Sequence, residues 1–166
     1  MTLSLLLLSI ATVLPLWAWP IPGEPRPHVR TTDDLARQIV RAGAIRSLTV
    51  ARLLDDLDRA NLIVYVSTSI DLRPRGSLYF LARPARTTYL VIRVRAQQTE
   101  PDRIAALAHE LHHALEVARA PFVVATPGDF LRLYQSIGFE CGQARFETRG
   151  ARLTEAVVRR ELHGRE

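Results

Sequence analysis

The spacing of apolar residues changes twice along the chain, and these changes predict the order of its elements. Helical spacing, with polar residues at the starts, predicts two helices over residues 31–43 and 47–60, the first capped by Thr31 or Thr32. β-Branched and alternating residues then predict strands over 62–66, 78–81 and 89–95. Helical spacing returns over 99–121, 126–137 and 146–162. Helices, a small antiparallel or mixed sheet and further helices together predict an α+β fold.

An uncharged run precedes this pattern. Residues 3–19 are 17 consecutive residues without a charged side chain. As a helix this run would span roughly 26 Å, slightly less than a bilayer core of about 30 Å, and the prolines and glycine of residues 20–23 would end it. We therefore expect a signal peptide or N-terminal membrane anchor at 1–23, a linker at 24–30 and one domain at 31–166. The protein is then exported (secreted or periplasmic) or anchored to the membrane.

Composition narrows the possible chemistry. The chain has 166 residues, the size of one domain, and its 22 basic residues are all arginine. A lysine nucleophile and a P-loop are therefore excluded. The single cysteine, Cys141, excludes an intramolecular disulfide and a multi-cysteine zinc module, and we expect it to be a small buried residue. Histidine, carboxylate, hydroxyl and arginine groups remain for any chemistry.

The net charge of +5 has a local origin. Residues 71–96 contain six arginines and one aspartate, so the net charge of this segment alone equals that of the whole chain. Without exposed aromatic residues interleaved on a known nucleic-acid-binding fold, a solvated sheet surface is the better interpretation, and we expect no nucleic acid as partner. Attraction to a membrane or another anionic envelope surface is the more reasonable use of this charge.

The candidate chemistry lies in the helix predicted over 99–121, which contains His109-Glu110-x-x-His113. Side chains four residues apart lie on one side of a helix, so both imidazoles can bind one ion at about 2 Å. Glu110 lies about 100° round the helix, where it can accept a proton from a water on that ion as the hydroxide attacks a carbonyl. Both histidines lie about 140° to 180° from Ile104, which begins the apolar stripe, so we expect them to lie away from the core.

A catalytic zinc needs a third protein ligand, and we expect it on the last predicted helix. Glu147 follows His113 by 34 residues and lies on the apolar stripe of that helix. A carboxylate facing a core is costly unless it is paired or bound to a metal, which is the reason to select Glu147. Glu155 at the edge of the stripe is the second candidate, and Glu140 in a predicted loop is the third.

Glu116 shares the histidine side of its helix. Its Cα lies roughly 10 Å from that of His109 on a straight helix, too far for both to bind one ion easily. We expect Glu116 either to orient a ligand histidine or to form an ion pair with Arg119 or Arg103.

The motif, followed by a glutamate on a later helix, resembles the zincin metallopeptidases, specifically the gluzincin type. The resemblance implies a minimal zincin domain with N-terminal helices, a small sheet, the motif helix and a C-terminal glutamate helix. It implies Zn²⁺ bound by His109, His113 and a downstream glutamate, for which Glu147 is the candidate, with Glu110 as general base. It also implies hydrolysis of peptide bonds in a peptide or protein substrate.

Other parts of the chain are candidates for smaller roles. Zincins commonly stabilise the oxyanion with Tyr, His or Arg, and Tyr134 is our candidate, with His163 behind it. His112 either helps to hold substrate or lies half exposed, and the second interpretation is favoured. The edge strand of the sheet would hold an extended substrate by β-pairing.

The alternative is a non-catalytic metal-binding or envelope interaction domain. Because a structural metal needs no general base, Glu110 at this position favours the enzyme.

Overall fold

The computed structural model describes residues 27–142 and 146–164. In chain order the elements are β1 (Val29–Thr31), α1 (Asp34–Arg46), α2 (Leu48–Asp58), β2 (Leu62–Ser69), β3 (Gly76–Ala82), β4 (Thr88–Arg95), α3 (Glu100–Ala118), α4 (Pro127–Ile137), β5 (Phe139–Glu140), β6 (Phe146–Glu147) and α5 (Arg149–His163). They confirm the predicted α+β fold. The signal or anchor expected at 1–23 lies outside the described residues. Among those described, no helix combines the length and apolar character needed to cross a membrane.

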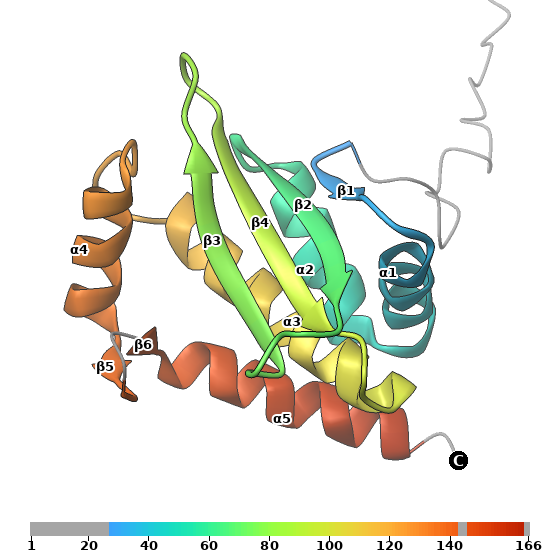
Figure 1. The fold of residues 1–166 in the computed structure, drawn as a ribbon. Coiled ribbons are helices and arrows are strands. Elements are labelled where there is room, and N and C mark those ends of the chain that lie inside the picture. The colour runs from blue at the N-terminus through green and yellow to red at the C-terminus, as the bar shows by residue number, and fades with distance from the viewer. Residues whose placement is uncertain (1–26, 143–145, 165–166) are drawn as a thin grey trace, which may run out of the picture.

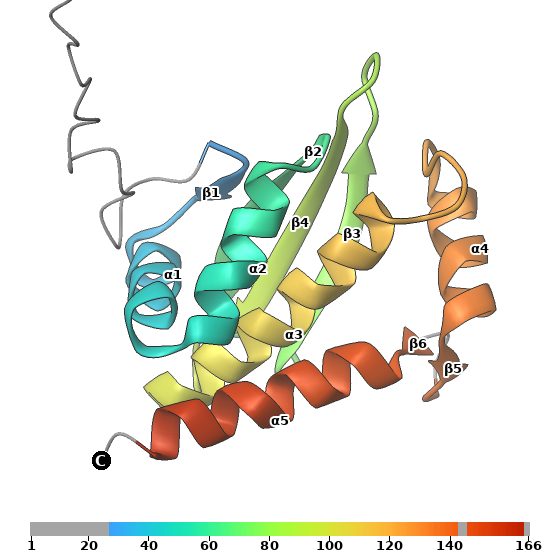
Figure 2. The same ribbon diagram turned by 180° about the vertical axis from the view of Figure 1, so that it is seen from behind.

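The main sheet is mixed and has the strand order β1-β2-β4-β3. β1, β2 and β4 are parallel, and β3 lies at the edge, antiparallel to β4. Figure 1 and Figure 2 show α1, α2 and α3 on one face of this sheet, while no described element covers the opposite face. In β4, for example, Leu90, Ile92 and Val94 are fully buried, and the residues between them point to the uncovered face.

The chain joins the sheet earlier than expected. Residues 24–30 were predicted to be a linker, but Val29 pairs with Val64 and Arg30 with Tyr65 in the parallel ladder of β1 and β2. A strand of three residues next to prolines is too short to produce a visible alternation, which is why the sequence pattern did not reveal it.

The first helix begins and ends later than predicted. Its N-cap is Asp33 rather than Thr31 or Thr32, because the Asp33 carboxylate accepts from the backbone N–H of Ala36 at 2.8 Å. Gly43 does not end the helix. It lies buried inside α1, where an added Cβ would lie 3.0 Å from Cγ1 of Val50, so this glycine allows α1 and α2 to pack closely.

The last helix begins three residues later than predicted. Thr148 is its N-cap, and the Thr148 hydroxyl accepts from the backbone N–H of Ala151 at 3.1 Å. Phe146 and Glu147 therefore belong to β6, which pairs with β5 in a second, two-stranded sheet.

Candidate metal centre

Two elements bring three ligand atoms together. His109 and His113 lie one turn apart in α3, and their Nε2 atoms are 3.1 Å apart. Oε1 of Glu147, on β6, lies 2.9 Å from Nε2 of His109 and 3.6 Å from Nε2 of His113. All three ligand atoms lie within 4.8 Å of one another. The three side chains selected from the sequence are therefore neighbours in space.

These separations can be compared with the size of a metal site. Ligand atoms at about 2.0–2.1 Å from a tetrahedral zinc ion are about 3.3 Å apart. The measured distances of 2.9, 3.1 and 3.6 Å lie on both sides of that value. His109, His113 and Glu147 thus form a group that could hold a metal ion, and two imidazoles with one carboxylate are donors that suit zinc.

Each imidazole also has a carboxylate at its other ring nitrogen. Nδ1 of His113 lies 2.7 Å from Oε2 of Glu116. Nδ1 of His109 lies 3.3 Å from Oε2 of Glu155, although the contact lacks hydrogen-bond alignment and this nitrogen has no other partner among the described residues. Carboxylates in this position orient metal-binding histidines in many proteins. Both rings therefore direct Nε2 toward the shared ligand position.

This arrangement decides between the two roles considered for Glu116. It orients His113, and its Oε1 accepts a hydrogen bond from the hydroxyl of Thr148 at 2.6 Å. Arg119 instead pairs with Asp56 at 3.0 Å.

Glu147 reaches the histidines from a different place than predicted. It was expected on the apolar stripe of the last helix, but it lies on β6, just before the Thr148 cap. Its Oε2 accepts from Nε of Arg152 at 3.1 Å, which leaves Oε1 directed at the histidines. Of the other candidates, Glu155 faces the outer nitrogen of His109, and Glu140 is exposed on β5.

The histidines are buried, contrary to the expectation that they lie away from the core. His109 is 8% exposed and His113 is 5% exposed. The helical wheel of α3 could not reveal this, because the covering side chains come from β6 and α5. A metal held here would be largely shielded from solvent.

The charges of the group are strongly coupled. Burial lowers the pKa of His109, but the carboxylates of Glu147 and Glu155 outweigh burial and raise the pKa to about 10. The same opposition between burial and the carboxylates of Glu116 and Glu147 raises the pKa of His113. Burial would raise the pKa of Glu147, yet its hydrogen bonds to the two histidines lower it. The carboxylates therefore favour protonated imidazoles, and a metal ion bound here would have to replace a proton.

Glu110 is buried beside the edge strand. It is 6% exposed, and a Cβ added to Gly76 of β3 would lie 2.8 Å from its Oε1. Burial raises the pKa of Glu110 to about 7, although the neighbouring histidines act in the opposite direction. A carboxyl group with this pKa can both accept and release a proton near neutral pH.

Tyr134 lies close to the metal group but uses its hydroxyl elsewhere. The side chain is buried on α4, and the hydroxyl donates to the backbone carbonyl of His113 at 2.9 Å. This bond ties α4 to the motif helix. The expected role of Tyr134 in stabilising an oxyanion stays a prediction.

His112 connects the two main helices of the site. Its Nδ1 lies 2.9 Å from the hydroxyl of Thr154 on α5, and its side chain is 25% exposed. A Cβ on Gly150 would lie 2.4 Å from Nε2 of His112, so this glycine is what allows the close approach. His163 lies at the opposite end of α5 from the metal group, and Cys141 is exposed rather than buried.

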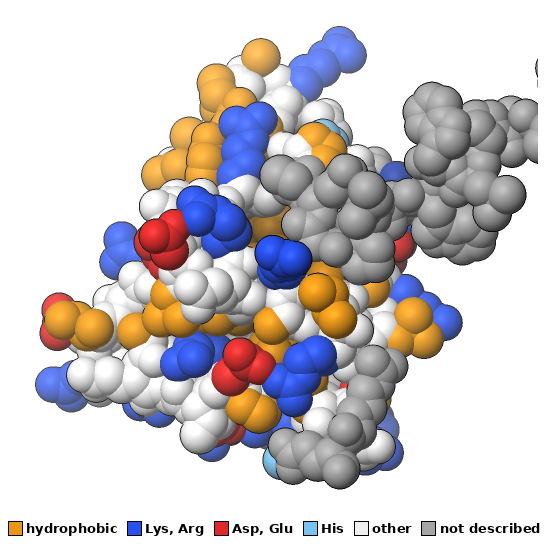
Figure 3. Space-filling model, turned by 90° about the vertical axis from the view of Figure 1, so that its right-hand side faces the viewer, with side chains coloured by type: hydrophobic (Ala, Val, Ile, Leu, Met, Phe, Trp, Pro, Cys, Tyr) orange, Lys and Arg blue, Asp and Glu red, His pale blue; other side chains and the backbone are white. Residues whose placement is uncertain are grey.

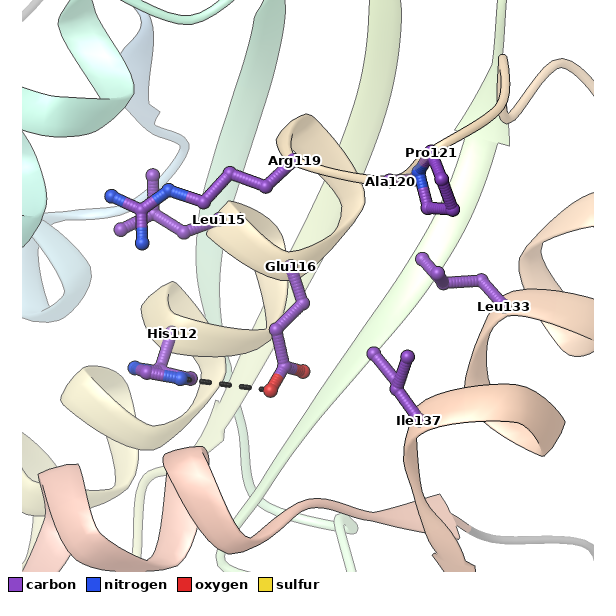
Figure 4. Close-up of a pocket in the computed structure, with 8 residues that line it drawn as sticks. All are labelled: His112, Leu115, Glu116, Arg119, Ala120, Pro121, Leu133 and Ile137. Atoms are coloured by element: carbon purple, nitrogen blue, oxygen red, sulfur yellow. Dashed lines mark ion pairs between the residues drawn. The ribbon is translucent and has the colours of Figure 1, made fainter.

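A cavity of about 290 Å³ lies beside Glu116, between the end of α3 and α4. Figure 4 shows its lining, which comprises His112, Leu115, Glu116, Arg119, Ala120, Pro121, Leu133 and Ile137. None of the three side chains of the metal group lines it. The lining nevertheless includes Glu116, the residue that orients His113.

Three contributors to the site were missed in the sequence. Thr148 caps α5 and binds Glu116, Arg152 binds Glu147, and Gly76 leaves space for Glu110. A hydroxyl residue directly after Glu147 was a readable capping signal, whereas nothing in the sequence connects Gly76 with Glu110.

Comparisons of the chain with protein-family models, curated proteins and solved structures found no match. The chemical interpretation of the site therefore depends on its own residues and geometry.

Proposed function

We propose that this protein is a zinc-dependent metallopeptidase of the gluzincin type. The observation that carries the proposal is the convergence of three ligand atoms from His109, His113 and Glu147 next to a buried Glu110. The pKa of the buried Glu110 carboxyl group is about 7, which suits proton transfer. A site that only held a structural metal would not need such a group beside its ligands.

The residues of the chain divide the work of peptide hydrolysis. A zinc ion bound to the three ligands would supply Lewis acidity, lowering the pKa of a water molecule and polarising the scissile carbonyl. Glu110 accepts the proton of the attacking water and then donates it to the leaving amine. The carboxylates of Glu116 and Glu155 hold the two imidazoles in place.

The edge strand suits an extended substrate. β3 is bonded on one side only, to β4, and an extended peptide can pair with its other side. Gly76 begins this strand and lies against Glu110, so a paired peptide would pass close to the general base.

Metal content and chelation test the proposal. We expect the purified chain to contain stoichiometric zinc by elemental analysis and to hydrolyse fluorescently labelled casein. Removing the metal with a chelator should abolish hydrolysis, and added zinc should restore it. A protein without bound zinc would sink the proposal, and one with zinc but no hydrolysis of any peptide would favour the non-catalytic alternative.

Zinc uptake should release protons. Because the pKa of His109 is raised to about 10, its imidazole is protonated at pH 7 before a metal binds. Zinc binds the neutral imidazole, so this proton must leave, whereas Glu147, with its lowered pKa, is already ionised. Below pH 10, affinity should therefore rise about tenfold per pH unit for each proton released.

Calorimetric titration of chelator-treated protein in buffers of different ionisation enthalpy measures this release. At least one proton per zinc is expected at pH 7. Zinc binding without proton release would contradict the pairing of His109 with Glu147.

Gly76→Ala should impair hydrolysis without removing zinc. The added methyl group would lie 2.8 Å from Oε1 of Glu110, and the carboxylate must move. A displacement of about 1 Å of a catalytic group can cost about 100-fold in rate. kcat/KM for a labelled peptide and the zinc content measure the two effects.

Gly128→Ala is the matched control, because a Cβ there would meet only the Thr126 hydroxyl, at an ordinary 3.6 Å. Equal activity of Gly76→Ala and wild type would show that the close approach of β3 to Glu110 has no role in catalysis.

A further inference from the structure

The uncovered face of the sheet carries aromatic and cationic side chains, which we call the open face. It includes Arg30, Tyr65, Tyr79, Tyr89, Arg93 and Arg95. Arg30, Tyr65, Val91 and Tyr79 are successive partners in the strand register, so one row of side chains crosses all four strands. The hydrophobic residues that alternate with them in β2 and β4 are buried under the helices.

Side chains of the open face contact one another. The rings of Tyr65 and Tyr89 are stacked, with centroids 6.4 Å apart and planes at 19°. The guanidinium of Arg93 lies 5.4 Å from the centre of the Tyr79 ring. Tyr79 is 43% exposed, and Arg30 and Arg93 are also exposed. The open face therefore combines apolar tyrosine rings with positively charged guanidinium groups.

No carboxylate balances this charge on the sheet itself. The four strands contain three arginines and no aspartate or glutamate. The side of the molecule near β1 and α1 differs, because acidic and basic side chains are intermixed there (Figure 3). Charge complementarity therefore selects an anionic partner for the open face.

We propose that the open face binds the anionic phospholipid surface of a bilayer. Tyrosine and arginine place apolar atoms against lipid while their polar ends reach the headgroups, and each arginine is attracted by anionic lipid. A single-stranded nucleic acid would instead need ring faces on which bases can stack. Here Tyr65 and Tyr89 stack on each other and Arg93 lies over Tyr79, which favours the membrane.

The chain upstream of the sheet suits the same partner. Residues 3–19 carry no charge, and nine residues, 20–28, separate them from β1. Nine extended residues span at most about 30 Å. If residues 3–19 remain as a membrane anchor, which is one of the two roles expected from their sequence, the sheet stays within that distance of the lipid surface. This proposal does not depend on the metal group or its chemistry.

Binding of the full-length chain to vesicles tests the proposal. Vesicles of phosphatidylcholine are compared with equimolar phosphatidylcholine and phosphatidylglycerol, and the readout is the ratio of the two affinities. Any contribution of the uncharged residues 3–19 enters both affinities, so the ratio reports the response to lipid charge. Arg30→Gln with Arg93→Gln should reduce this ratio about 25-fold, since each arginine near an anionic surface is worth about fivefold.

The matched control is Arg41→Gln with Arg52→Gln, which changes the net charge equally on α1 and α2, at exposed positions on the other side of the sheet. This control should nearly keep the wild-type ratio. Tyr79→Ser should weaken binding to both kinds of vesicle, because it removes an exposed ring. Circular dichroism melting checks that each variant is folded.

Two results would overturn the proposal. Equal losses in the two double variants would show that only the total charge matters. A fluorescent single-stranded oligonucleotide that binds through Arg30 and Arg93, without any preference of the protein for anionic vesicles, would assign the open face to nucleic acid.

Discussion

Glu110→Gln is expected to leave the zinc content unchanged and to reduce hydrolysis of labelled casein by about 10²–10⁴-fold. The amide keeps the size of the carboxylate and can fill its buried position beside Gly76, but it cannot accept the proton of water. Elemental analysis and initial rates of hydrolysis measure the two quantities. Full zinc with lost activity would separate the general base from the metal-binding residues.

The control for this variant is Glu100→Gln, which makes the same chemical change at an exposed position in the same helix. Its activity should equal that of wild type. Unchanged hydrolysis by Glu110→Gln would contradict the general-base role and leave the metal group without its proposed chemistry.

Glu147→Ala should weaken zinc binding more than Glu155→Ala. The carboxylate of Glu147 faces Nε2 of His109, where a metal would lie, so its loss removes a ligand. Glu155 faces Nδ1 of the same ring, and removal of such an orienting carboxylate typically costs about 10–100-fold in metal affinity. We expect Glu147→Ala to exceed that range and to approach the loss caused by His113→Ala.

Competition with a fluorescent zinc chelator measures these affinities, and Glu140→Ala is the control. Glu140 is exposed on β5, the strand that pairs with β6, so its loss should leave zinc affinity unchanged. If Glu147→Ala binds stoichiometric zinc with wild-type affinity, Glu147 is not the third ligand, and Glu155 or Glu116 takes that role.

The larger elements of the fold were predictable because their patterns are long. The strands β2, β3 and β4 and the helix α3 lie where alternation and helical spacing placed them, and Thr99 caps α3 as expected. Short elements were not predictable. β1, β5 and β6 have only two or three residues each, too few to show a pattern, and β1 also pairs with a strand distant in sequence.

The metal group was predictable in its members but not in its geometry. The i,i+4 spacing places His109 and His113 together because one helix holds both. Glu147 was selected on the assumption that it belonged to a helix, and it lies on β6 instead. The structure places Glu147 beside the two histidines, but the reason for selecting it, a position on the apolar stripe of a helix, was wrong.

Of the two carboxylates that orient the histidines, only Glu116 had this role among its alternatives in the sequence analysis. Glu116 lies three residues from His113 on the same helix, so its role could be stated as one of two alternatives. Glu155 reaches His109 only because α5 packs along α3, and the sequence does not reveal how two helices pack.

The position of Glu147 on β6 also has a consequence for the time at which the site can form. Glu147 is 38 residues from His109 in the chain, so the ribosome releases both histidines well before the glutamate. A growing chain that ends before residue 147 has two of the three side chains that could hold a metal ion, and it lacks the segment that buries them. If the proposed metal binds, uptake with full affinity must therefore wait until β6 and α5 have been synthesised and have packed on α3. In the proposed peptidase, this order would keep the unfinished polypeptide inactive in the compartment where it is made.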